Sequence, residues 1–334
     1  MNDEQAMREA LVLAVSPDAP RGENPRVGCL IIRDNGVVVG RGYHRGAGTA
    51  HAEIEALEDA GERAAGAAAF VTLEPCRHTG RTGPCADALI EAGVTRVVFG
   101  QSDPTDAAGG GADVLRDAGV EVVSGILAEE TEAINAEWTF AVGAGRPFVT
   151  WKVAVSLDGR VAGPDGGPTA ITGESARADV HDLRSTVGAI IVGTGTALAD
   201  NPSLTVRRDE PMTGAPPLRV IVGSREIAAT AQVRDDQALT LIVEADPAEV
   251  LAQLYDRGVR HALLEGGPTL ASAFLEAGLV DRVVWYVAPL MLGSGPVALP
   301  PGASRPMEVA VSEVAVVGED VRITGMVNYQ RVES

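Results

Sequence analysis

The sequence of 334 residues is poor in cysteine, in aromatic residues and in long apolar runs. Three cysteines are too few for a disulfide framework, which favours reduced thiols and a cytoplasmic protein. Aromatic residues make up 4%, so Val, Leu, Ile and Ala must fill the interior. No stretch approaches the ~18 uninterrupted apolar residues that a membrane-spanning helix needs. The opening sequence, MNDEQAMREA, is polar and acidic, unlike a secretory signal.

Positive charge is also scarce, with 27 Lys and Arg against 46 Asp and Glu and a net charge of −19. An acidic protein repels phosphate backbones, which argues against nucleic acid and anionic membranes as partners. A phosphorylated small substrate must therefore be bound by a few local arginines. Hydrophobic residues reach 46%, enough for a substantial core, and the length predicts about two domains.

Strand-like and helix-like segments alternate along the chain, which predicts layered α/β domains. Asp3 is expected to cap a first helix. A further helix is expected from Leu127 to Ala141, and the segment from Gly143 to Pro147 is typical of a linker. We therefore predict one α/β domain over residues 1–146 and a second over residues 147–334.

The stretch from His51 to Cys85 has the clearest chemical signature in the chain. His51, Cys76 and Cys85 offer one imidazole and two thiolates, which are ligands that Zn²⁺ prefers. Three protein ligands leave a fourth tetrahedral position open, as in catalytic zinc sites. Glu53, two residues after His51, is placed to act as general acid and base without being a ligand. This pattern, H-x-E followed by P-C and a second Cys, is that of the zinc deaminases.

Other interpretations of these residues are weaker. A closed structural zinc site would need a fourth ligand, and no further Cys or His lies at ligand spacing. Cys29 lies in an apolar strand, which is typical of a core cysteine. His78 lies between the two thiolates in the sequence and is a ligand in principle. We favour a contact with the substrate for His78, because the site needs its fourth position for water.

The first ~146 residues resemble the deaminase half of the bifunctional riboflavin-biosynthesis deaminase/reductase family. The matching residues are Asn24-Pro25-x-Val27-Gly28, His51-Ala52-Glu53 and Thr72-Leu73-Glu74-Pro75-Cys76-x-His78-x-Gly80-Arg81-Thr82-x-Pro84-Cys85. Most cytidine and tRNA adenosine deaminases have a shorter gap between their cysteines, so the longer insert favours this family. The resemblance implies a cytidine-deaminase-like three-layer α/β/α domain followed by an α/β domain similar to dihydrofolate reductase.

The same resemblance implies that a set of polar residues contacts the pyrimidine or its ribose phosphate: Asn24, His44, His78, Arg81 and Asp103. Three of them also have ordinary structural interpretations. Asn24 before a proline and Asp103 before Pro104 are common turn residues, and Arg81 is compatible with a solvated side chain. In the segment that begins at Asp103, the family usually has Asp-Pro-Asn-Pro, whereas this chain has Asp103-Pro104-Thr105-Asp106.

The second half resembles the reductase domain of that family. The matching residues are Lys152, Ser156-Leu157-Asp158-Gly159-Arg160, Arg184-Ser185, Thr196-x-Leu198-Ala199-Asp200-Asn201-Pro202-x-Leu204-Thr205-Val206-Arg207 and Glu265-Gly266-Gly267-Pro268-Thr269-Leu270. The family's Ser-x-Trp is replaced by Pro168-Thr169-Ala170. A Gly-Gly turn that opens a helix presents backbone N–H groups to a phosphate, although it is not a G-x-G-x-x-G fingerprint.

The resemblance implies an NADPH site formed by Ala154, Ala170, Thr196, Asp200, Ser224, Gly267, Pro268, Thr269, Leu270, Ala271, Ser272 and Ala273. It implies a reductase substrate site formed by Lys152, Pro168, Arg184, Leu204, Arg207 and Glu265. The two arginines are suited to the substrate phosphate, because guanidinium binds phosphate bidentately. The choice between NADPH and NADH stays open, with Arg225 as a candidate for the additional phosphate.

The leading hypothesis is a bifunctional enzyme of riboflavin synthesis that binds Zn²⁺ and NADPH and self-associates, as the family commonly does. It deaminates 2,5-diamino-6-ribosylamino-4(3H)-pyrimidinone 5′-phosphate and then reduces the ribosyl group to ribityl. One alternative is a deaminase whose second domain has lost reductase turnover. A nucleic-acid-editing deaminase and a non-catalytic zinc protein are further alternatives, and the charge of −19 argues against the former.

Overall fold

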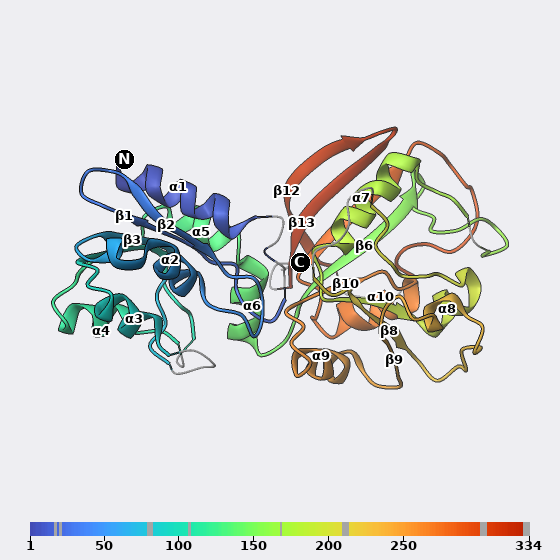
Figure 1. Ribbon diagram of the computed structural model, residues 1–334. Helices are drawn as coiled ribbons and strands as arrows, with labels where there is room; N and C mark the ends of the chain where they lie inside the picture. Colours follow the sequence, from blue (N-terminus) through green and yellow to red (C-terminus); the bar gives the residue numbers. More distant parts are fainter. Residues whose placement is uncertain are drawn as a thin grey trace. The chain divides into compact units, whose positions relative to one another are not determined.

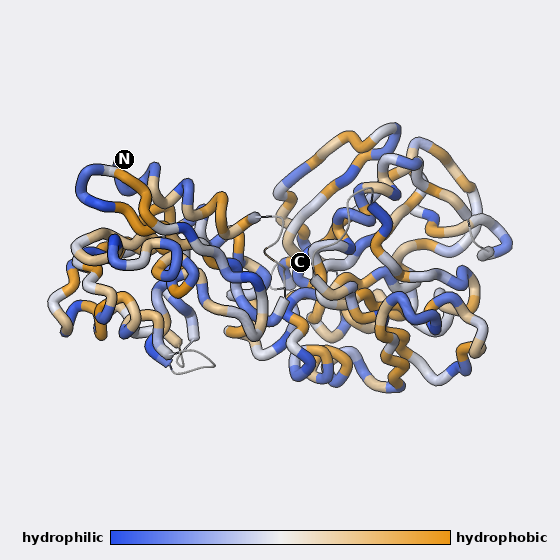
Figure 2. The backbone as a smooth tube through the Cα atoms, in the orientation of Figure 1, coloured by the Kyte–Doolittle hydropathy of each residue, from blue (hydrophilic) through white to orange (hydrophobic). Residues whose placement is uncertain are grey.

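The computed structural model in Figure 1 describes residues 1–16, 19, 22–78, 83–105, 108–167, 169–208, 214–300 and 306–329. The chain divides into two compact units, Met1–Ala144 and Gly145–Ser334. Hydrophobic stretches run through the strands of each unit, with hydrophilic turns between them (Figure 2). Within the described ranges, no helix is both long and apolar enough to cross a membrane.

The first unit is a five-stranded sheet in the order β2-β1-β3-β4-β5. Its strands are β1 (Gly28–Ile32), β2 (Val38–Tyr43), β3 (Ala68–Leu73), β4 (Arg96–Gln101) and β5 (Glu121–Ser124). Its helices are α1 (Asp3–Ala14), α2 (Ala52–Ala60), α3 (Cys85–Glu91), α4 (Gly111–Asp117), α5 (Ala128–Ala133) and α6 (Ala136–Ala144), with a 3-10 helix η1 (Gly61–Ala64). β1 is antiparallel to β2 and β3, whereas β3, β4 and β5 run parallel.

β1 is buried on both faces, which explains its unbroken apolar sequence. Its side chains alternate between the two helical layers of Figure 1, because successive strand residues point to opposite faces. Cys29 packs in the core beneath α2, as expected for a core cysteine, while Leu30 packs in the core beneath α1. Gly42 lets α2 lie very close to β2, since a Cβ there would be 2.2 Å from the carbonyl oxygen of Ala52. This contact places the start of α2 beside the sheet.

Two expected details of the first unit are wrong. The cap of α1 is Asn2, not Asp3, because the Asn2 side chain accepts a hydrogen bond from the Gln5 backbone N–H and the Gln5 side chain accepts one from the Asn2 backbone N–H. The helix expected over 127–141 is divided into α5 and α6. Asn135 lies between them, where its side chain bonds both backbone groups of Arg26, and α6 continues to Ala144.

The second unit is an eight-stranded sheet in the order β12-β13-β11-β6-β10-β7-β8-β9. Its strands are β6 (Phe148–Ser156), β7 (Ala189–Gly193), β8 (Leu218–Val222), β9 (Thr240–Val243), β10 (His261–Leu264), β11 (Arg282–Ala288), β12 (Glu308–Val317) and β13 (Asp320–Asn328). Its helices are α7 (Glu174–Arg184), α8 (Thr194–Asp200), α9 (Pro247–Tyr255) and α10 (Pro268–Glu276), with a 3-10 helix η2 (Gln232–Arg234).

The second unit is also three-layered. α7 and α8 pack against one face of the sheet and α9 and α10 against the other, as seen in the residues of the apolar clusters. β6, β10, β7, β8 and β9 run parallel. Their carboxyl ends therefore meet at one edge of the sheet, which is where ligands bind in open α/β sheets.

Candidate active sites

The three predicted zinc ligands lie together in the first unit. His51 is the N-cap of α2, Cys76 follows β3, and Cys85 is the first residue of α3. Nδ1 of His51 is 3.2 Å from the Cys85 sulfur and 3.6 Å from the Cys76 sulfur. All three ligand atoms lie within 4.8 Å of one another. Residues that are far apart in the sequence thus converge on one point.

This donor set fits a zinc ion. With Zn–S of about 2.3 Å and Zn–N of about 2.0 Å, tetrahedral geometry places a nitrogen and a sulfur ligand about 3.5 Å apart. The two N···S separations of 3.2 and 3.6 Å agree with that value. The backbone N–H of Cys85 also donates to the Cys76 sulfur at 3.4 Å, which favours a thiolate at Cys76.

The electrostatics of the site favour an ionised sulfur at Cys76 and a proton-carrying carboxyl group at Glu53. Hydrogen bonds from Cys85 and His51 lower the pKa of Cys76 to about 4, even though its burial opposes the change. The pKa of Cys85 is raised by its hydrogen bond to Cys76 and by burial. Glu53, in the first turn of α2, is buried, and burial raises its pKa to about 7. A carboxyl group with such a pKa is suited to both accepting and donating a proton near neutral pH.

Two of the predicted substrate residues form a fixed pair beside the zinc ligands. Nδ1 of His44 lies 3.0 Å from the Ala50 carbonyl oxygen, and its Nε2 lies 3.0 Å from Nδ2 of Asn24. A carbonyl only accepts, so Nδ1 must donate and Nε2 accepts from Asn24. Burial lowers the pKa of His44, which favours this neutral form. The rings of His44 and His51 are 5.6 Å apart, edge to face.

The remaining predicted contacts of this site have different positions. His78 is exposed, and its ring centroid is 6.5 Å from that of His51. The Asp103 carboxylate accepts from the backbone and hydroxyl of Thr105 at 2.8 and 2.6 Å, which forms a local turn. Arg81 lies outside the described residues. The cluster therefore brings together Asn24, His44 and His78, whereas Asp103 belongs to the loop before α4.

Glu74 organises that loop, a role that the sequence alone did not indicate. Its buried carboxylate accepts backbone hydrogen bonds from Asp103, Gly110 and Ala112 at 3.2, 3.0 and 3.1 Å. Gly111 lies against this segment, since a Cβ there would be 1.8 Å from the Pro75 carbonyl oxygen. The chain before Cys76 is thus held tightly between β3 and α4.

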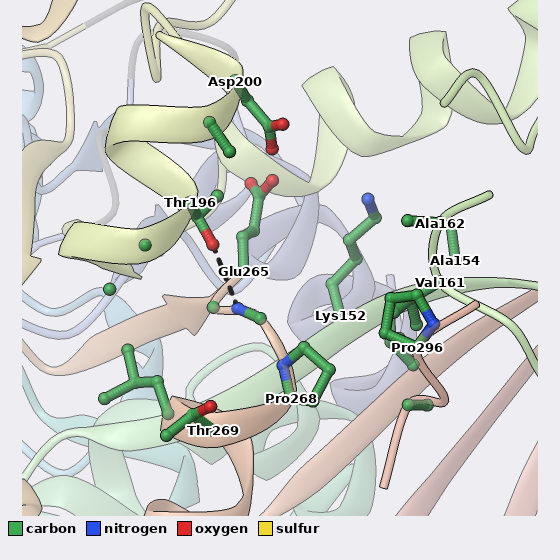
Figure 3. Close-up of a pocket in the computed structure, with 18 of the residues that line it drawn as sticks. Lys152, Ala154, Val161, Ala162, Thr196, Asp200, Glu265, Pro268, Thr269 and Pro296 are labelled. Atoms are coloured by element: carbon green, nitrogen blue, oxygen red, sulfur yellow. Dashed lines mark hydrogen bonds between the residues drawn. The ribbon is translucent and has the colours of Figure 1, made fainter. Parts of the chain in front are cut away.

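A cavity of about 1070 Å³ lies in the second unit, at the carboxyl edge of β6, β10, β7 and β8 (Figure 3). Its volume is at the upper end of the range for ligand sites. Most of the predicted cofactor and substrate residues line it: Lys152, Ala154, Ala170, Arg184, Thr196, Asp200, Arg207, Ser224, Glu265, Gly267, Pro268, Thr269, Leu270 and Ala273.

Lys152, Glu265 and Arg184 form the charged centre of this cavity. Leu264 pairs with Trp151, so Glu265 follows beside Lys152 on the neighbouring strand, and Figure 3 shows both side chains entering the same space. Arg184 binds both carboxylate oxygens of Glu265, Nε to Oε1 at 2.6 Å and Nη2 to Oε2 at 2.8 Å. Burial alone would raise the pKa of Glu265, but Arg184 and Lys152 outweigh it and lower that pKa. Burial lowers the pKa of Lys152.

The other end of the cavity is formed by backbone turns. Gly267 is the N-cap of α10, and its N–H bonds Oγ1 of Thr196 at 3.2 Å (Figure 3). A Cβ at Gly266 would be 2.8 Å from the Leu270 side chain, so this turn needs glycine. The start of α10 therefore presents backbone N–H groups to the cavity, which fits the phosphates of a dinucleotide.

Four predicted reductase residues are not among those that line the cavity. Leu204, Ala271 and Ser272 are buried in the unit, and Pro168 lies outside the described residues. Leu204 adopts a positive φ of 49° next to the segment that carries Arg207.

The structure also adds residues that the sequence did not indicate. Thr194, Arg177 and His181 line the cavity. His181 lies against Arg207, with the Arg207 backbone nitrogen 3.2 Å from its Nδ1. Its position on α7, three residues before Arg184, was the available signal, since residues three apart share a helix face. Thr169 closes its own loop, because its hydroxyl accepts from Gly163 and donates to Gly167.

Comparison with protein families assigns a different family to each half. Residues 1–101 match the cytidine and deoxycytidylate deaminase zinc-binding region. Residues 147–323 match the RibD C-terminal domain. The first match contains the zinc ligands and the second contains the cavity.

Whole-chain relatives agree with this division. The chain is 50% identical over 276 residues to the riboflavin biosynthesis protein RibD of Mycobacterium tuberculosis, covering 82% of this chain and 80% of that protein. It is 40% identical over 329 residues to RibD of Escherichia coli, covering 88% and 89%. Among solved structures, Acinetobacter baumannii RibD has a TM-score of 0.90 at 36% identity, covering 98% of this chain and 99% of that chain. A Thermotoga maritima diaminohydroxyphosphoribosylaminopyrimidine deaminase/5-amino-6-(5-phosphoribosylamino)uracil reductase has a TM-score of 0.86 at 31% identity, covering 97% and 98%.

Proposed function

Because the chain belongs to the family of the riboflavin biosynthesis protein RibD, we propose that it catalyses two successive steps of riboflavin synthesis. The first unit hydrolytically deaminates 2,5-diamino-6-ribosylamino-4(3H)-pyrimidinone 5′-phosphate. The second reduces the ribosyl group of 5-amino-6-(5-phosphoribosylamino)uracil to ribityl with NADPH. The observation that carries this proposal is the presence, on one chain, of the zinc-ligand cluster beside Glu53 and of the charged cavity around Glu265.

For the deamination, His51, Cys76 and Cys85 would hold Zn²⁺, which would lower the pKa of a water molecule and so supply a nucleophile. The nucleophile attacks the ring carbon that bears the exocyclic amine. Glu53 takes a proton from water and passes it to the departing nitrogen, which leaves as ammonia. Glu53 thus returns to its starting protonation state. Its burial and its place in the first turn of α2, two residues after His51, support this role.

We propose that Asn24 binds the pyrimidine edge and that the His44 ring, whose two nitrogens are already hydrogen-bonded, packs against the pyrimidine. Their mutual hydrogen bond fixes the orientation of both groups, which suits recognition of a flat ring with a set order of donors and acceptors. His78, Arg81 and Asp103 are proposed to contact the pyrimidine or its ribose phosphate, as the family resemblance implies. Removing the His44 ring by His44→Ala is expected to raise KM for the pyrimidine.

In the reductase, the cofactor site consists of Ala154, Ala170, Thr196, Asp200, Ser224 and the turn that opens α10. The substrate site consists of Lys152, Arg184, Arg207 and Glu265. When bound, NADPH would supply a hydride to C1′ of the ring-opened, imine-like form of the substrate, solvent would supply the proton for the resulting amine, and NADP⁺ would remain. Arg184 and Lys152 hold Glu265 as a carboxylate facing the cavity, where it orients the ribose hydroxyl groups. Arg207 binds the substrate phosphate.

The direct test is incubation of the purified full chain with the diaminopyrimidine substrate, followed by measurement of ammonia and of NADPH oxidation. Both signals are expected. Glu53→Gln should abolish ammonia release while NADPH oxidation with pre-deaminated substrate continues. Ammonia release by this variant at the wild-type rate would remove Glu53 from the mechanism.

NADPH oxidation with pre-deaminated substrate also decides against the alternative in which the second unit has lost turnover. The match of residues 147–323 to the reductase family and the paired charges in its cavity favour an active reductase. Absence of NADPH oxidation, with normal ammonia release, would favour a deaminase alone.

We propose further that the enzyme is a cytoplasmic homo-oligomer acting on a small phosphorylated pyrimidine. β12 is at the edge of the eight-stranded sheet and exposes Val311, Val314 and Val316 by 55, 64 and 78%. A long apolar edge strand is an aggregation hazard unless it is covered, and a second copy of the chain is the expected cover. Val314→Lys should shift the mass measured by light scattering to that of a smaller species. An unchanged mass would place the contact elsewhere.

A further inference from the structure

We propose that Arg225 selects NADPH over NADH by binding the phosphate on the 2′ position of the adenosine ribose. This inference rests on the proposed reductase function. It assigns the cofactor specificity to one side chain at the end of the cavity that is farthest from Lys152.

The strand order gives the cavity two ends. Lys152 lies on β6, and Arg225 follows β8, with β10 and β7 between these two strands. Adjacent strands are about 4.8 Å apart, so three steps span about 14 Å. Glu265 and Arg184 lie near the Lys152 end, where the substrate and the reacting ring of the cofactor belong. The other half of an elongated dinucleotide must therefore lie toward β8.

Among the described residues, Arg225 at that end has no carboxylate partner. Arg184 is paired with Glu265, the Arg207 side chain lies against His181, and Arg177 donates to the Thr172 carbonyl. Nε of Arg225 lies 3.4 Å from Oγ1 of Thr194, which is its only hydrogen bond among the described residues, and it has no ion pair there. Its two terminal nitrogens are thus available to an anion.

The surroundings of Arg225 leave space for such an anion. Gly195 lies beside the guanidinium, since a Cβ there would be 2.7 Å from Nη2 of Arg225 and the arginine side chain would have to shift. Ser224 and Thr194 line the same part of the cavity and add hydroxyl donors. Guanidinium binds phosphate bidentately, whereas NADH has only a neutral hydroxyl at this position. In a chain with a net charge of −19, a dianion needs such a local cation.

The test measures dissociation constants of NADPH and NADH for the full chain and its Arg225→Gln variant, by nicotinamide fluorescence at fixed ionic strength. Loss of a charged hydrogen-bond pair predicts about 10- to 100-fold weaker NADPH binding. NADH binding should be unchanged, which also shows that the site is folded. Arg225→Lys should retain part of the preference, because it keeps the charge without the bidentate geometry. Arg257→Gln, an exposed arginine on the surface outside the cavity, is the matched control and should change neither constant.

Two results would overturn the inference while leaving the reductase intact. One is an unchanged NADPH-to-NADH ratio in Arg225→Gln, and the other is an equal loss of both cofactors. Binding of neither cofactor to the wild-type chain would instead contradict the proposed reductase function, and this inference with it.

Discussion

The buried pair of Arg184 and Glu265 allows stability and catalysis to be separated by experiment. Its side chains are only 12 and 9% exposed, and two hydrogen bonds join them. Arg184→Met would leave the Glu265 carboxylate buried without its bidentate partner. Removing one partner of a buried pair typically costs about 3–5 kcal/mol, because the remaining charge stays desolvated. We expect a loss of that size in the free energy of unfolding of the second unit.

A second substitution tests whether the unpaired charge of Glu265 causes this loss of stability. Adding Glu265→Gln to Arg184→Met removes the unpaired charge at almost constant volume, so most of the lost stability should return. Reductase activity should stay absent in both variants, because neither has the charged centre. Urea unfolding followed by the fluorescence of Trp151 and Trp285, whose rings are 5.3 Å apart in this unit, measures the free energies. Ammonia release reports separately on the first unit and should not change.

The stabilisation by the Arg184–Glu265 pair depends on pH in a defined direction. Arg184 and Lys152 lower the pKa of Glu265 below its ordinary value of 4.5. The stabilisation by the pair is therefore fully present above about pH 4.5 and is lost as the pH falls through the lower pKa of the folded state. The difference between wild type and Arg184→Met should shrink in acid. If Arg184→Met unfolds at the wild-type urea concentration at pH 7, the carboxylate is satisfied by other groups and the argument is refuted.

Three further predictions concern the first unit. Removal of zinc by a chelator should abolish ammonia release and leave NADPH binding intact, and a parallel loss of NADPH binding would contradict separate sites. Glu74→Gln should accelerate zinc loss on dialysis and lower the free energy of unfolding by about 1–3 kcal/mol, because one amide oxygen cannot accept all three backbone hydrogen bonds. Zinc retention equal to wild type would exclude a positioning role for Glu74. Gly111→Ala should destabilise the unit because its Cβ would meet the Pro75 carbonyl oxygen at 1.8 Å, whereas Gly143→Ala, with nothing within 4 Å, should be neutral or slightly stabilising in thermal unfolding.

The elements that the sequence predicted well are those defined by local pattern. β1 is a continuous apolar run and is buried throughout. Cys29 lies within this strand and packs in the core, as its apolar neighbours predict. The division of the expected helix over 127–141 depends instead on Asn135, whose partner Arg26 is 109 residues away. No local pattern contains that contact.

By itself, the sequence determined which donor atoms are available and therefore which chemistry is proposed: His51, Cys76 and Cys85 are candidate zinc ligands by residue type and motif, and Glu53 is the proposed acid-base group by its spacing. These properties are local. Only the tertiary structure decided that Glu265 is held by Arg184, 81 residues earlier, and that Arg225 lies at the far end of the same cavity. Strand order and register set those distances, and they arise from packing of the whole unit, which short-range patterns do not contain.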